Sequence, residues 1–123
     1  GRVVAIELER EHGTVVWRVD VLTADAIREL DVDAATGAVL ANRIDSDGDD
    51  VQKTSLLANA ASVDHAAALR LAEAQVSGGR VADLKLDDDH DAPVWKVDLV
   101  SAGPTQHEVT IDAASGAVTK REG

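Results

Sequence analysis

The chain has 123 residues, a formal net charge of -11 and 45% hydrophobic residues, but no cysteine, methionine, phenylalanine or tyrosine. That size allows one ordinary domain, or two very small ones sharing a core of Val, Leu, Ile and Ala. The spread negative charge repels phosphate and anionic lipid, which argues against nucleic acid or a membrane surface and favours a basic protein or a cation as partner.

The cysteine count and the hydropathy exclude further classes. Without cysteine the chain forms no disulfide, thiolate nucleophile or cysteine-ligated zinc site. Its apolar stretches are shorter than the roughly 20 residues of a transmembrane helix, so we expect no direct membrane insertion from this segment. Because the chain begins with Gly1 rather than methionine, we expect a mature or trimmed form.

An internal repeat organises the chain. Residues 2–22 align with residues 80–100 at a constant offset of 78, and eight positions are identical, among them Trp17 and Trp95. After one extra residue the match resumes, with DAATGAV at 33–39 over DAASGAV at 112–118. The repeat predicts two modules of the same fold, in which Trp17 and Trp95 occupy the same position in the buried layer.

Strands are predicted in the first copy from the alternation of apolar and polar residues. They centre on residues 4–8, 17–21, 30–32 and 39–41. Glu7, Glu9 and Asp20 then fall on the face that should be wet. In each copy the Asp and Gly of DAATG or DAASG predict a tight hairpin between the third and fourth strands.

An acidic segment follows the first copy. Residues 44–53, IDSDGDDVQK, are polar and contain glycine, so we predict a linker. Alternating carboxylates make weak calcium candidates of Asp45, Asp47, Asp49 and Asp50. In EF-hand register, however, the sixth and twelfth positions hold Asp and Leu instead of Gly and Glu. A solvated linker is therefore the favoured interpretation.

One long helix is predicted, over residues 62–76, and the strands of the second copy come after it. Ser62 is the expected N-cap, Asp64 lies in the first turn, and Gly78 and Gly79 end the helix. The segment is apolar on two sides, which one sheet does not require. This suggests a helix shared between both copies.

Candidate catalytic and metal-binding groups are few. His12 and His90 are repeat equivalents at a hairpin tip, where solvated turn residues are expected. The chain has no HExxH motif, no histidine cluster at zinc spacing and no nucleophile elbow, and its serines fall in predicted turns, caps or linkers. We therefore predict no enzyme, no catalytic residues, no cofactor and no metal beyond the calcium candidates.

The second copy resembles the PepSY domain. The resemblance rests on the Ala-rich helix, the GG that follows it, the acidic alternating strand, the WKVDL strand and DAASGAV. It covers residues 62–119, and residues 2–40 without a preceding helix. It implies an α+β fold of two cystatin-like, antiparallel four-stranded sheets with one main helix packed on the sheet. The second copy is complete and the first copy lacks its N-terminal helix.

The domain boundaries that follow from the resemblance are 1–44 for the first repeat, 45–61 for the acidic linker and 62–123 for the second repeat. The dry face of the first copy then needs another cover. A helix preceding Gly1, the shared helix or a neighbouring chain would serve, and the last of these makes the chain a homodimer. An uncovered apolar face of this size favours association.

The resemblance also implies a function. PepSY domains occur in propeptides of secreted metallopeptidases and in bacterial envelope proteins, and they contribute no catalytic residues. We expect an extracellular or cell-envelope bacterial protein that acts as a non-catalytic binding module, with a protein partner such as a secreted peptidase that it inhibits or regulates. The alternative is a structural or sensory envelope module that binds a small ligand or cation and has no peptidase target.

Overall fold

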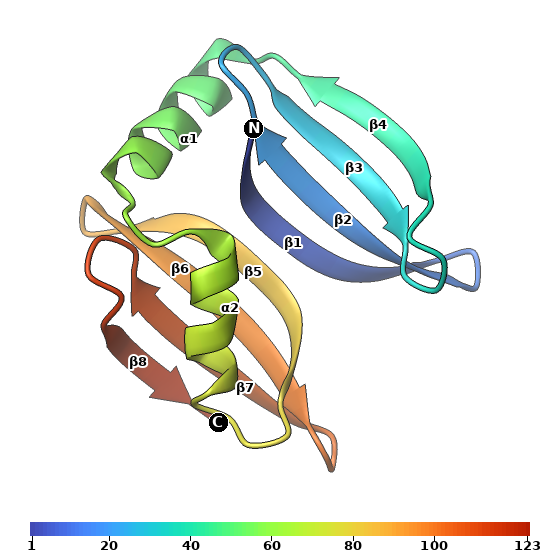
Figure 1. Ribbon diagram of the computed structural model, residues 1–123, viewed down its shortest axis with the longest axis vertical. Coiled ribbons are helices and arrows are strands. Elements are labelled where there is room, and N and C mark those ends of the chain that lie inside the picture. Colours follow the sequence, from blue (N-terminus) through green and yellow to red (C-terminus); the bar gives the residue numbers. More distant parts are fainter.

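The computed structural model describes residues 1–123 as one antiparallel sheet of eight strands with two helices (Figure 1). The sheet order is β4-β3-β2-β1-β5-β6-β7-β8. We call β1–β4 the first half and β5–β8 the second half. The elements in chain order are β1 Arg2–Glu11, β2 Thr14–Leu22, β3 Ile27–Asp33, β4 Val39–Asp45, α1 Gly48–Ala60, α2 His65–Glu73, β5 Arg80–Asp89, β6 Ala92–Ser101, β7 Thr105–Asp112 and β8 Val118–Glu122.

The prediction of two separate sheets is wrong, because β1 pairs with β5 and joins the halves. A free strand edge exposes unpaired N–H and C=O groups, and this pairing removes two such edges at once. The junction is short: Ala5 lies opposite Lys85, Ile6 opposite Leu84 and Glu7 opposite Asp83. By contrast, β1 pairs with β2 over its whole length.

The junction has local two-fold symmetry. The sequence offset of 78 makes Ile6 the equivalent of Leu84, and these two residues face each other across the junction. Their neighbours pair reciprocally, Ala5 with the equivalent of Glu7 and Glu7 with the equivalent of Ala5. A two-fold axis perpendicular to the sheet therefore passes between Ile6 and Leu84, as in an isologous interface between two subunits.

The hairpins of the two halves share their backbone geometry, as the repeat predicts. His12 and His90 both have positive φ, 49° and 53°, in the two-residue turns between β1 and β2 and between β5 and β6. In the later hairpins Asp33 and Asp112 each accept two backbone N–H groups at 2.8 and 3.0 Å. The glycines that close these turns, at positions 37 and 116, have φ of 78° and 83°. The predicted turn chemistry is confirmed.

The predicted linker is partly wrong, because α1, Gly48–Ala60, occupies most of residues 45–61. The Asp47 side chain accepts hydrogen bonds from the backbone N–H groups of Asp49 and Asp50, which is the N-cap arrangement that starts a helix. Ala58 of α1 is buried, and Arg2 donates a hydrogen bond to its carbonyl. The cap, the buried Ala58 and the partly buried Val51 and Leu57 hold this polar segment as a helix.

Helix α2 is shorter than predicted, and Asp64 rather than Ser62 is its N-cap. The carboxylate of Asp64 accepts a hydrogen bond from the backbone N–H of Ala67 at 2.8 Å. The N–H groups of Ser62 and Val63 instead donate to the carbonyl of Ala113, each at 2.9 Å. These bonds hold the lead-in against the β7–β8 turn and keep it out of the helix.

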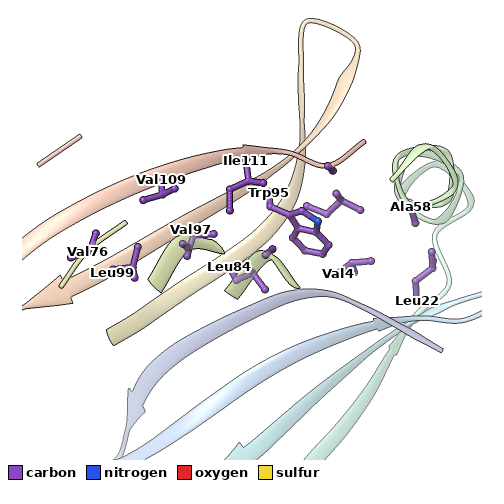
Figure 2. Close-up of a cluster of buried hydrophobic side chains, with 14 of the residues drawn as sticks. Val4, Leu22, Ala58, Val76, Leu84, Trp95, Val97, Leu99, Val109 and Ile111 are labelled. Atoms are coloured by element: carbon purple, nitrogen blue, oxygen red, sulfur yellow. The ribbon is translucent and has the colours of Figure 1, made fainter. Parts of the chain in front are cut away.

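The core lies between α2 and the second half of the sheet, with a smaller extension toward α1 (Figure 2). Ala68 and Ala72 of α2 are fully buried, and such small side chains let the helix approach the sheet closely. The sheet contributes side chains with no exposed surface, namely Leu84, Val97, Leu99, Val109 and Ile111. Helix α2 is thus not shared evenly, since it packs on β5, β6 and β7 and only its margin touches β1.

Candidate binding face

The first half of the sheet has an apolar groove where the second half has a helix. The groove measures about 560 Å³. Side chains from β1, β2 and β3 form its floor, α2 forms one wall and the segment that enters β5 closes one end. The lining residues are Ile6, Trp17, Val19, Val32, Leu69, Glu73, Gly79, Arg80 and Val81.

The groove floor consists of the repeat equivalents of core residues. Seven apolar positions on this face of the second half are all buried, and none of the seven equivalents in the first half is. Leu8, for example, is 39% exposed, whereas its equivalent Leu86 is 6% exposed. The seven pairs are Ile6/Leu84, Leu8/Leu86, Trp17/Trp95, Val19/Val97, Val21/Leu99, Leu30/Val109 and Val32/Ile111.

The two tryptophans show the difference most clearly. They have the same register, since Trp17 faces Leu8 and Val32 while Trp95 faces the equivalents of those residues. Trp95 is 2% exposed, and its indole N–H donates to the carbonyl of Val63 at 2.8 Å. Trp17 is only half-buried, and the structure gives it no such hydrogen bond. The predicted common position is confirmed for the register and wrong for the burial.

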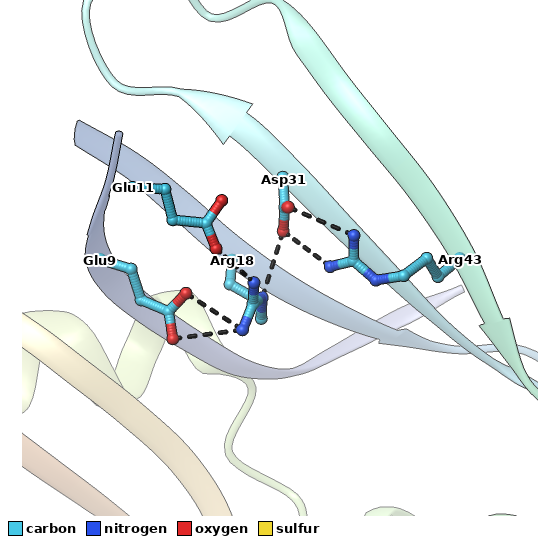
Figure 3. A network of polar contacts seen from close by, with 5 residues as sticks. All are labelled: Glu9, Glu11, Arg18, Asp31 and Arg43. Atoms are coloured by element: carbon cyan, nitrogen blue, oxygen red, sulfur yellow. Dashed lines mark hydrogen bonds and ion pairs between the residues drawn. The ribbon is translucent and has the colours of Figure 1, made fainter. Parts of the chain in front are cut away.

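On the opposite face of the first half an ion-pair network ties the four strands together (Figure 3). The guanidinium of Arg18 lies 3.0 Å from Glu9, 2.9 Å from Glu11 and 3.1 Å from Asp31. Arg43 reaches Asp31 from β4 at 2.9 Å. Hydrogen bonds from Arg43 and then from Arg18 lower the pKa of the buried Asp31 carboxyl. Asp31 is therefore held as a carboxylate, which makes it a structural group and a poor proton donor.

The sheet face that was predicted to be exposed to solvent, which carries Glu7, Glu9 and Asp20, is only partly exposed. Asp20 is half-buried and its Oδ1 has no hydrogen-bond partner. Burial, reinforced by the nearby charge of Glu29, raises its pKa. Burial likewise raises the pKa of Asp83, with Glu7 and Asp98 adding to the effect. The correction has a simple cause: Asp20 on β2 and Asp83 on β5 lie on inner strands of a wide sheet, so the neighbouring strands screen these side chains from water.

The calcium candidates lie at the start of α1. Asp47 caps the helix, and Asp45 accepts the backbone N–H of Asp47 at 2.9 Å. A hydrogen bond with Asp45 and the charges of Asp45 and Asp47 raise the pKa of Asp50. No group of three or more His, Asp or Glu side chains is arranged to hold a metal ion. Helix capping therefore accounts for this run of acids, and calcium binding stays a prediction.

One serine and histidine pair was missed by the sequence interpretation. Ser101 was predicted to lie outside the strands but is the last residue of β6, and its hydroxyl lies 2.8 Å from Nε2 of His107 on β7. The structure gives the other ring nitrogen of His107 no hydrogen bond to a carboxylate, which a nucleophile and base pair needs for orientation. The equivalents in the first half are Thr23 and Arg28, so the pair is not part of the repeat.

The groove walls were also missed, because they come from outside the first copy. Leu69 and Glu73 belong to α2, and Arg80 and Val81 to the start of β5. The second apolar side of the 62–76 segment was the one available signal, since it contains Leu69. The sequence contains no signal for the network around Arg18, because its members lie on four strands and the pairing of these strands is known only from the structure.

Comparison with known proteins identifies the fold. The sequence profile described as "Peptidase propeptide and YPEB domain", abbreviated PepSY, matches residues 1–43 and 63–122. The chain belongs to the PepSY family. The two matched segments of this PepSY chain correspond to the two halves of the sheet, and α1 lies between them.

A solved structure resembles the whole PepSY chain. It is a crystal structure from Clostridium difficile 630 described as a "putative lipoprotein", with 25% sequence identity and a TM-score of 0.57. The match covers 98% of this chain and 81% of that chain. No curated protein matches the chain significantly. None of its helices is long and apolar enough to cross a membrane.

Proposed function

We propose that this chain is a non-catalytic, protein-binding module of the bacterial cell envelope that inhibits or regulates a peptidase, built from two tandem PepSY copies. The uncovered apolar groove of the first half carries this proposal, because its floor repeats a core that elsewhere in the chain is covered. The description of the family as a peptidase propeptide supports the choice of a peptidase as partner. The lipoprotein neighbour supports the envelope.

A rigid platform suits a steric mechanism. The strands of the first half are braced by the network around Arg18 on the face opposite the groove. The outer strand β4 leaves its edge free and exposes Val39, Leu40 and Ile44. A partner can therefore contact the groove and add a strand to the β4 edge without deforming the sheet.

A non-catalytic role fits the polar groups. Glu9, Glu11 and Asp31 of the first half are engaged in ion pairs, and the Ser101 and His107 pair has no carboxylate to orient it. Hydrolysis needs a positioned nucleophile, a base and donors for the developing charge. The binding energy of this module is thus available for occlusion of a partner.

The test is a titration of secreted metallopeptidases from the source organism with the purified chain. We expect at least one enzyme to lose activity in a stoichiometric manner, with a break at one equivalent. The Val19→Asp variant, which places a charge in the groove, should lose this inhibition, while Val118→Asp, on the exposed edge strand β8 of the second half, should retain it. Indifference of every enzyme in the panel to the wild-type chain would refute the peptidase proposal.

The groove volume favours one second candidate, a structural or sensory envelope module that binds a small ligand. About 560 Å³ is within the range of small-molecule pockets, roughly 300–1,000 Å³. A ligand or cation at a hundred times its Kd adds about 2.7 kcal/mol to the stability. Thermal melting with candidate ligands, with calcium and with a chelator measures this gain, and an unchanged Tm throughout would remove this candidate.

A further inference from the structure

We propose that the short seam between β1 and β5 is a pH-sensitive and salt-sensitive hinge, which opposed carboxylates loosen at neutral pH and which protonation or screening by salt tightens. The inference goes beyond the proposed function, because it concerns how the two halves of the chain pair and involves no peptidase. Three observations carry it: the length of the seam, the register of acidic residues across it and the lack of ion pairs that would offset them.

The seam is the shortest strand pairing of the sheet. It consists of three residue pairs, whereas the β1–β2 and β5–β6 pairings beside it run along the whole strands. On the helix face α1 contacts β2, β5 and β6, and α2 reaches β1, so other contacts also hold the halves together. A weaker pairing at the seam therefore changes the angle between the halves and does not separate them.

A row of like charges crosses the seam on the face opposite the helices. Ile6 and Leu84 face the core, so Glu7 and Asp83 beside them lie on the opposite face, directly across from each other. Paired side chains of neighbouring strands have Cβ atoms roughly 4.5–5.5 Å apart, and like charges at this spacing are destabilising. The acids that continue the row over the second half, each directly opposite the one before, are Asp98, Glu108 and Glu122.

No cation offsets the charges at the seam. Neither Glu7 nor Asp83 forms an ion pair. Arg18 lies opposite Glu7 on β2, but its guanidinium is bound by the three acids of the network described above. Lys85, two residues from Asp83, lowers the pKa of that carboxyl. Burial, and then the charges of Glu7 and Asp98, outweigh this and raise the pKa.

The direction of the pH effect follows from these groups. A carboxyl whose pKa is raised by folding destabilises the folded state when it ionises. The repulsion at the seam is therefore complete at neutral pH, declines as the pH falls through the raised pKa of Asp83 and is largely removed at about pH 4. The charged and titratable side chains around the seam are Glu9 on β1, Arg18 and Asp20 on β2, Lys85 on β5, Lys96 and Asp98 on β6, His107 and Glu108 on β7, and Glu122 on β8.

The hinge also sets the geometry of the groove. The groove floor lies on β1, β2 and β3, whereas its walls are α2 and the start of β5, which belong to the second half. A change of angle at the seam therefore changes the width of the groove. In this way protonation on one face of the sheet is transmitted to the other face.

Hydrogen exchange followed by NMR on the whole ¹⁵N-labelled chain measures the seam. The readout is the protection of the amides in residues 5–7 and 83–85 relative to those of the β2–β3 pairing, corrected for the intrinsic pH dependence of exchange. We expect this relative protection to rise about fivefold from pH 7 to about pH 4 at low salt. It should also rise at pH 7 when about 0.5 M NaCl is added, because salt screens exposed charges.

Three variants test the cause. Asp83→Asn and Glu7→Gln each remove one charge of the opposed pair, so each should raise the relative protection at pH 7 roughly two- to fivefold and flatten its pH dependence. In the double variant the gains should be less than additive, because both changes remove the same repulsion. Asp88→Asn is the matched control, since this exposed aspartate of β5 lies opposite Pro93 and should leave the seam as it is in the wild type.

Spin labels test the hinge motion itself. The chain has no cysteine, so Ala35→Cys and Ala114→Cys, in exposed and equivalent hairpins of the two halves, give one labelled pair. The distribution of distances between the two labels should be narrower at pH 4 than at pH 7. Equal widths would overturn the hinge.

The contrary outcomes of the exchange experiment are equally definite. A relative protection that stays constant or falls between pH 7 and pH 4 in the wild type would overturn the inference, and this series needs no variant to fold. An equal gain from Asp88→Asn would assign the effect to net charge, and additive gains would assign it to independent groups, so either would overturn the opposed pair as the cause. Because no peptidase is used, these results leave the proposed function to its own test.

Discussion

Val97 and Val19 form a matched pair that tests whether the groove is open in solution. They are repeat equivalents on β6 and β2, but Val97 is fully buried beneath α2, whereas Val19 is half-buried on the groove floor. Truncation to alanine removes the same two carbon atoms in both places. The difference in stability loss therefore reports the cover and not the chemistry of the substitution.

The magnitudes follow from burial. Each buried methyl or methylene contributes about 0.8 kcal/mol, so Val97→Ala loses about 1.6 kcal/mol of transfer free energy. A cavity of roughly 40 Å³ at about 24 cal/mol per Å³ adds close to 1 kcal/mol, for a total of about 2.5 kcal/mol. Val19→Ala leaves no closed cavity and removes partly hydrated atoms, so its free energy of unfolding should fall by less than about 1 kcal/mol.

Urea denaturation followed by circular dichroism measures both losses, at concentrations low enough to keep the chain monomeric. An unchanged slope of the free energy against urea shows that the denatured state is comparable in the two variants. If Val19→Ala lowered the free energy of unfolding as much as Val97→Ala, the groove floor would be covered in solution, and the reasoning on its vacancy would be refuted.

Three further predictions concern the acidic side chains. Asp47→Ala removes the cap of α1 and should lower the free energy of unfolding by about 1 kcal/mol in urea melts run with chelator, whereas no loss would mean that the cap is dispensable. Asp20→Asn removes a carboxylate whose pKa is raised by burial, so it should raise the free energy of unfolding at pH 7 by less than about 1 kcal/mol, which is measured as a higher Tm. That gain should vanish as the pH falls through the raised pKa to below about 4, and a gain that persists at pH 3 would contradict the cause. Asp31→Asn breaks the ion pairs with Arg18 and Arg43 and should cost about 1 kcal/mol at pH 7. Because the pKa of Asp31 is lowered, this difference is present above pH 4 and should disappear as the pH falls through the lowered pKa, which melts across that range will show.

Local chemistry explains what was predictable in the fold. The alternation of apolar residues sets strand positions, because a strand repeats every two residues, and the Asp and Gly pairs set the hairpins, because they bond or bend only their own neighbours. Both features were confirmed in both halves. The N-cap of α2 was misplaced by two residues, because Ser62 and Asp64 are both good caps and only the hydrogen bonds to Ala113 decide between them.

The candidate site was predictable only in part. The exposed dry face of the first copy followed from the repeat, since a copied strand pattern without a copied helix leaves its apolar side uncovered. The walls made by Leu69 and Arg80 did not follow, because they depend on where the second half lies relative to the first. The raised pKa of Asp20 was also hidden, since it depends on how the side chains of the paired strands β1 and β3 pack around this carboxyl.

The sequence by itself determined the two repeated strand sets, their turns and the identity of Trp17 and Trp95 as one position, because these depend on neighbours within a few residues. The tertiary structure decided that β1 and β5 join in one sheet, that α2 covers one half, and that Trp17 lies in a groove while Trp95 lies in a core. Pairing of distant edges and the choice of a helix between two similar faces depend on the total area buried, which no local pattern contains.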